Sequence, residues 1–124
     1  MTSPVTRAQT DSRLVFLTRW AAWIALVLIL FLMFVPPALR PVSDLPHALE
    51  HLLVFLLTGV AFGIGYPEQR LTMAMAAVPV TAVLELLQLL APGRHARVSD
   101  FVLNALGACA GIAIAAGTCR KHVR

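Results

Sequence analysis

Four long apolar runs, separated by short polar segments, constrain the fold of this chain more than any other feature. They predict helices at about residues 17–37, 47–66, 71–91 and 100–118. Each run is close to the ~20 residues that an α-helix needs to cross a hydrocarbon core of ~30 Å. Because lipid offers the backbone no hydrogen bonds, few structures other than helices can fill such spans. The sequence therefore predicts an all-α membrane protein, a bundle of four transmembrane helices.

The composition supports a membrane protein of one domain. Of the 124 residues, 59% are hydrophobic and only 13% are charged, which is unlike a soluble domain. A soluble domain this small has too little interior to bury so much apolar side chain. We expect a transmembrane domain over residues 14–118, between a disordered N-terminal tail (1–13) and a basic C-terminal tail (119–124).

The first apolar run has a second interpretation, as the core of a cleaved signal peptide. The run continues almost unbroken from Trp20 to Pro37, and no small-x-small cleavage site follows it cleanly. We therefore expect an uncleaved first transmembrane helix.

The positive charges lie beside the apolar runs, which argues for lipid contact rather than nucleic-acid binding. The net charge is +4, but no platform of basic and aromatic residues accompanies it, so no nucleic-acid partner is expected. With four spans, the side that holds both termini carries seven Lys and Arg residues, and the other side carries three. Because such residues stay inside, both termini are predicted to be cytoplasmic, in a multi-pass protein of the bacterial cytoplasmic (inner) membrane.

Polar residues of three predicted helices converge at one end of this bundle, the outer end. His51 lies near the start of the second helix, Glu85 and Gln88 near the end of the third, and Asp100 and Asn104 at the start of the fourth. A carboxylate such as Glu85 costs roughly 2.5–3.5 kcal/mol inside a span, so it usually faces a partner or a water-filled cavity. We predict an outer polar pocket around Glu85, although this side chain could instead reach up to the headgroups.

The turn before the fourth helix supplies a further candidate for this pocket. Pro92 and Gly93 favour a tight reversal of the chain, and Arg94 follows them. The Arg94 guanidinium suits bidentate contact with a carboxylate or a phosphate, and an anchor in the headgroup region is the alternative. Ser99 or Asp100 can cap the fourth helix.

Small residues recur at every fourth position along the fourth helix. Gly107, Gly111 and Ala115 form a stripe that lets another helix approach closely. We expect helix packing there, either within the bundle or between copies in a homo-oligomer.

The start of the second helix also contains the pattern H-x-x-E-H, from His47 to His51, which is the spacing of an inverted zinc-protease helix. Such a site needs a third ligand and a water-accessible cleft, and only Glu85 is available as that ligand. We therefore predict no metal and no cofactor. In this interpretation His51 belongs to the outer polar pocket, His47 lies at its edge, and Glu50 is a solvated acid at the helix start.

The segment ELLQLLAPGRHARVSDFVLNALGACAG resembles the VanZ-like family of small integral membrane proteins. The family pattern is E-x-x-Q, a P-G-R turn, then D-x-x-x-N-x-x-G and a further glycine. The matching positions are Glu85, Gln88, Pro92, Gly93, Arg94, Asp100, Asn104, Gly107 and Gly111. His51 and Phe55 match an upstream histidine and phenylalanine, so the resemblance covers roughly residues 46–115. In one departure, His47 and Ala48 stand where the family commonly has an acid–lysine pair.

The resemblance implies a small multi-span protein of the cell envelope. The family's namesake is associated with teicoplanin resistance, so the expected partners are membrane lipids and a lipid-linked envelope precursor or lipoglycopeptide. We expect a non-catalytic protein whose pocket binds a lipid-linked or polar headgroup, with a role in glycopeptide (teicoplanin-type) resistance.

Two alternatives remain open. One is a membrane-embedded hydrolase or transferase acting on an envelope lipid, with Glu85 or His51 as base and Arg94 as clamp, but no nucleophile signature supports it. The other is a small proton-coupled transporter, although transport sites usually lie near the membrane midplane.

Overall fold

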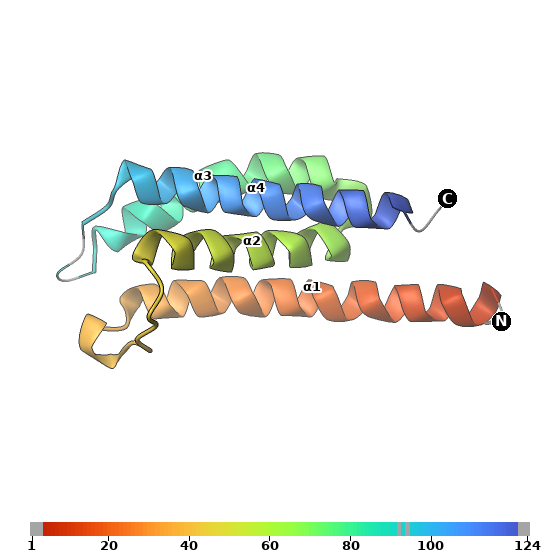
Figure 1. Cartoon of the computed structure of the whole chain (residues 1–124), viewed down its shortest axis with the longest axis horizontal. Coiled ribbons are helices and arrows are strands. Elements are labelled where there is room, and N and C mark those ends of the chain that lie inside the picture. Colours follow the sequence, from red (N-terminus) through yellow and green to blue (C-terminus); the bar gives the residue numbers. More distant parts are fainter. Residues whose placement is uncertain (1–3, 92, 94, 122–124) are drawn as a thin grey trace.

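The computed structural model describes residues 4–91, 93 and 95–121, and each regular element in this part of the chain is a helix. The elements are α1 (Pro4–Phe34), η1 (Pro37–Leu39), α2 (His47–Gly65), η2 (Pro67–Gln69), α3 (Arg70–Gln88) and α4 (Val98–Lys121), where η marks a short 3-10 helix. The four α-helices lie side by side along one axis (Figure 1). The α1–α2 and α3–α4 connections lie at one end, here called the two-loop end, and the α2–α3 turn lies at the other.

Each α-helix contains a segment long and apolar enough to cross a membrane. These segments are Asp11–Phe34, His47–Gly65, Pro67–Gln88 and Val98–Thr118, of which the third includes η2 as well as α3. Large apolar side chains along them are exposed, for example Leu17, Val27 and Leu86, as expected where lipid is the solvent. The predicted all-α fold, with four helices of transmembrane length and composition, is confirmed for the described residues.

The first helix starts earlier than the sequence predicts. Because α1 begins at Pro4, the prediction of a disordered tail over residues 1–13 is wrong for residues 4–13; the first three residues lie outside the described part. Proline is tolerated at the start of a helix, where its missing N–H has no partner to lose. A helix already nucleated in an apolar run also extends at little cost. At its other end α1 stops at Phe34, ahead of two prolines that disfavour helical dihedral angles before them.

The boundaries on either side of the last turn also differ from the prediction. α3 ends at Gln88 rather than at about 91, and the next two residues form a turn. α4 starts at Val98 and continues to Lys121, so its described part includes residues 119–121 of the predicted tail. The helix pattern of the fourth run therefore extends past its apolar segment at both ends.

Glycines bring the backbones of α2 and α4 into direct contact. A Cβ atom at Gly111 would overlap the carbonyl oxygen of Leu56, and one at Gly59 would overlap the α4 backbone. A Cβ atom at Gly107 would lie 2.8 Å from an α2 carbonyl oxygen, and Ala115 on the same stripe is 1% exposed. The small-residue stripe of α4 thus lies against α2 of the same chain, as a close helix contact in a membrane requires.

The side chains of three arginines reach the C-terminal end of α2 or of α1, where the helix dipole favours positive charge. Arg19 of α1 donates from Nε to the Gly65 carbonyl at 2.6 Å, and Arg70 donates from Nε to the Gly63 carbonyl at 2.8 Å. Arg40 donates to the backbone just past the end of α1, at 2.8 Å. The first two bonds tie α1 and the start of α3 to the end of α2.

A small apolar layer, with one residue from each α-helix, lies beneath the two-loop end. Its buried residues are Met33, Phe55, Leu84 and Ala108. Phe55 follows His51 by one helical turn, Ala108 follows Asn104 by one turn, and Leu84 precedes Glu85 directly. This layer holds the polar residues of three helices at one level, at the end of the bundle.

Candidate functional site

Seven polar residues from three helices gather at the two-loop end and are here called the polar cluster. They are His47, Glu50 and His51 at the start of α2, Glu85 and Gln88 at the end of α3, and Asp100 and Asn104 at the start of α4. Antiparallel helices joined by short connections place these three helix ends together (Figure 1). Four members are buried, with exposed fractions of 5% for Glu85, 5% for Gln88, 7% for Asp100 and 0% for Asn104.

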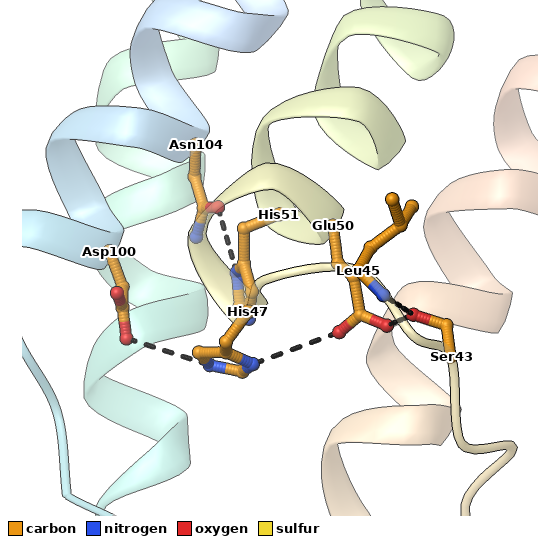
Figure 2. Close-up of polar contacts among 7 residues, drawn as sticks. All are labelled: Ser43, Leu45, His47, Glu50, His51, Asp100 and Asn104. Carbon is orange, nitrogen blue, oxygen red and sulfur yellow. Dashed lines mark hydrogen bonds and ion pairs between the residues drawn. The ribbon is translucent and has the colours of Figure 1, made fainter.

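A hydrogen bond between His51 and Asn104 joins α2 to α4 inside the polar cluster. The Nδ1 atom of His51 lies 3.0 Å from the Oδ1 atom of Asn104 (Figure 2). Because an amide oxygen only accepts, Nδ1 carries the proton, and a neutral ring then presents Nε2 as an acceptor. The amide nitrogen of Asn104 is buried and has no hydrogen-bond partner among the described residues.

Glu85 joins the end of α3 to the segment that leads into α4. Its Oε1 atom accepts a hydrogen bond of 2.9 Å from the backbone N–H of Arg97. Its Oε2 atom is buried and, within the described part of the chain, has no hydrogen-bond partner. The polar pattern of the sequence predicts a pocket around this carboxylate but does not identify a backbone N–H as its partner.

His47 lies between two carboxylates from different helices. Its Nδ1 atom is 3.8 Å from Oε2 of Glu50, and its Nε2 atom is 4.0 Å from Oδ2 of Asp100 (Figure 2). The rings of His47 and His51 pack edge to face, with centroids 4.4 Å apart. Glu50 also accepts a hydrogen bond from the hydroxyl of Ser43.

His47 and Glu50 lie at the edge of the polar cluster, where the side chain of His47 is 60% exposed and that of Glu50 is 35% exposed. The Glu50 carboxylate contacts both the Ser43 hydroxyl and the His47 ring. His47 connects the start of α2 to Asp100 at the start of α4. The i, i+3 spacing of His47 and Glu50 was the available signal, because residues so spaced lie on one face of a helix.

The turn between α3 and α4 is only partly described. Gly93 has φ = 76°, a left-handed conformation that glycine adopts without steric cost. Pro92 and Arg94, which the sequence assigned to the turn and to the outer polar pocket, lie outside the described residues.

The described members of the polar cluster include three carboxylates and two imidazoles. Both ion pairs found in the described part of the chain involve His47, and neither involves a lysine or an arginine. No group of three or more His, Cys, Asp or Glu side chains among the described residues is arranged to hold a metal ion. The two histidines of the H-x-x-E-H pattern instead contact each other and two different residues of α4, Asn104 and Asp100.

A comparison with known proteins supports the family resemblance that the polar residues at this end of the bundle suggest. The chain matches the VanZ/LLP1 family over residues 5–119, which includes nearly all of the four α-helices and every member of the polar cluster. No significant match was found among curated proteins or among solved structures. Because the family match extends over nearly the whole sequence, this chain of four membrane-type helices belongs to the VanZ/LLP1 family.

Proposed function

We propose that this protein is a non-catalytic membrane protein of the cell envelope whose polar cluster binds the headgroup of a membrane lipid or of a lipid-linked envelope molecule. The observation that carries the proposal is a pair of buried polar atoms, Oε2 of Glu85 and Nδ2 of Asn104, that have no hydrogen-bond partner among the described residues. One is an acceptor on α3 and the other is a donor on α4.

The free-energy cost of such atoms supports a binding role. A buried donor or acceptor without a partner costs about 1–3 kcal/mol, and a carboxylate within a membrane span costs roughly 2.5–3.5 kcal/mol on insertion scales. Polar groups retained at this cost in a membrane are commonly functional. A headgroup with hydroxyl, amide or amine groups offers both donors and acceptors, which is what the two atoms lack.

We place the polar cluster at the outer face of the bacterial cytoplasmic membrane. The basis is the distribution of basic residues, seven on the side of the termini and three on the side of the two-loop end, because positive residues favour the cytoplasm. In this orientation the cluster lies at the level of the outer-leaflet headgroups. A lipid-bearing glycopeptide acts at the same face, so the proposal extends to teicoplanin-type resistance by competition for a lipid-linked target.

The proposal is tested by measuring the lipid that purifies with the full chain. Glu85→Gln removes a charge with little change of shape, and Asn104→Leu removes both polar groups of a fully buried side chain. Glu68→Gln, at an exposed position in η2 at the opposite end, is the matched control. We expect less bound lipid per protein in the first two variants and no change in the control, with helix content checked by circular dichroism. Equal lipid in all three folded variants would contradict the proposal.

The resistance role has its own measurement. Expression of the chain in a teicoplanin-susceptible bacterium should raise the inhibitory concentration of teicoplanin more than that of vancomycin, which lacks the lipid tail. The increase should be lost in Glu85→Gln and kept in Glu68→Gln. If the inhibitory concentration rises equally with both variants, teicoplanin resistance does not depend on the polar cluster.

A further inference from the structure

We infer that the group recognised at the polar cluster is a primary ammonium group, as in an ethanolamine headgroup, rather than a phosphate alone. The inference rests on the proposed function and adds the chemical class of the ligand. It follows from the charges of the cluster, from the distances between His47 and the carboxylates beside it, and from the buried acceptor Oε2 of Glu85, which has no partner among the described residues.

The charge of the polar cluster is unfavourable for an anion. Glu50, Glu85 and Asp100 bring three carboxylates to one end of the bundle, and no lysine or arginine side chain of the described residues lies within 4.0 Å of them. A phosphate in this position would meet like charges in a partly desolvated site, where repulsion is poorly screened. A cation placed there would be attracted for the same reason.

His47 cannot satisfy the two carboxylates that flank it. The ring of His47 hydrogen-bonds to neither carboxylate, whichever of its nitrogens carry protons. Its distances of 3.8 Å to Glu50 and 4.0 Å to Asp100 exceed those of a hydrogen bond. The Asp100 side chain is 11% exposed, so it remains partly reachable as an acceptor of strong donors. An ammonium group supplies three such donors on one atom.

The two buried atoms that have no partner among the described residues match different parts of a headgroup. Oε2 of Glu85 lacks a donor, which an ammonium group supplies, and Nδ2 of Asn104 lacks an acceptor, which a headgroup oxygen supplies. Asn104 lies one turn from Asp100 on the same face of α4, and its bond to His51 is made by Oδ1 and not by the amide nitrogen (Figure 2). Glu85, 5% exposed, carries its free Oε2 on the neighbouring helix α3. The Glu85 carboxylate adds to the negative charge of Asp100 at this end of the bundle, which favours a cation, and Arg97, exposed at the same end, can meet the phosphate of a zwitterionic headgroup.

Native mass spectrometry of the delipidated full chain in detergent tests this inference, first with the unsubstituted protein and then with two variants. The probes are dioleoyl phosphatidylethanolamine, phosphatidylcholine and phosphatidylglycerol. Phosphatidylcholine keeps the positive charge but has no N–H donors, and phosphatidylglycerol has no cation. We expect phosphatidylethanolamine to bind about tenfold more strongly than either, which corresponds to the loss of one charge-assisted hydrogen bond. Asp100→Asn should remove the preference, and Glu68→Gln should keep it.

The outcomes separate the inference from the proposed function. Equal binding of phosphatidylethanolamine and phosphatidylcholine, or preference for phosphatidylglycerol, would overturn the ammonium assignment. If that equal binding is still lost in Asn104→Leu, headgroup binding stands and only the ammonium assignment fails. Lipid binding that is insensitive to every substitution in the cluster would overturn the proposed function itself. Protection from heat unfolding by ethylammonium chloride alone would overturn a lipid as the source of the amine.

Discussion

Substitution of Gly111 by alanine gives the sharpest test of how the bundle is held together. The added Cβ atom would overlap the carbonyl oxygen of Leu56 and would lie 2.7 Å from the backbone nitrogen of Val60. Both atoms belong to the α2 backbone, so no side chain can turn aside and the two helices must separate. Overpacking of this kind costs about 1–3 kcal/mol. Alanine also favours a helix over glycine by about 0.5–1 kcal/mol, which offsets part of the loss.

Gly117 provides the matched control on the same helix. No atom lies within 4 Å of a Cβ atom built there, so Gly117→Ala keeps only the helix-propensity gain. The stability difference between Gly111→Ala and Gly117→Ala therefore isolates the steric cost, about 1–3 kcal/mol with the control more stable. Reversible unfolding in mixed detergent micelles, followed by circular dichroism, measures both variants. Equal stability of the two would refute direct backbone contact between α2 and α4.

Three further predictions address the two ends of the bundle. His51→Ala leaves the buried amide of Asn104 without its partner at 3.0 Å, so the free energy of unfolding should fall by about 1–3 kcal/mol; an unchanged value in the same unfolding assay would contradict this. Arg19→Leu removes the bond of 2.6 Å to the Gly65 carbonyl and the stabilising charge at that helix end. We expect the free energy of unfolding to fall by about 1–2 kcal/mol, and an unchanged value would contradict the capping role of Arg19. In a cysteine-free background, Ser99→Cys should react with an impermeant maleimide added to intact cells, whereas a cysteine at the N-terminus should not; the reverse pattern would invert the topology.

The number and type of helices could be predicted from the sequence because apolar runs of membrane length leave the backbone few alternatives. The helical state of residues 4–13 could not, since that segment has no apolar pattern and owes its structure to continuation of α1. The stripe at Gly107 and Gly111 indicated a close contact, but only the structure identifies α2 as the partner.

The candidate site, like the fold, could be predicted from the sequence only in part. Alternation of helix direction is enough to predict that Glu85 and Asn104 belong to one end of the bundle. The acceptor and donor roles at that end depend on loop geometry, which sequence spacing does not encode. The bond from the Arg97 backbone to Glu85 and the approach of His47 to Asp100 are both of this kind.

Asn104 allows the central claim, that the polar cluster binds a headgroup, to be tested at one atom. It is the single asparagine of the chain, so labelling with ¹⁵N-asparagine gives one side-chain amide group, seen as a single pair of NH₂ signals, in the NMR spectrum of the protein in micelles. Its Nδ2 atom is buried without a partner among the described residues. Addition of phosphatidylethanolamine to the delipidated chain should shift this pair of signals in a saturable way, and the shift should be lost in Glu85→Gln but kept in Glu68→Gln. Signals that do not move with any lipid would contradict headgroup binding at the polar cluster.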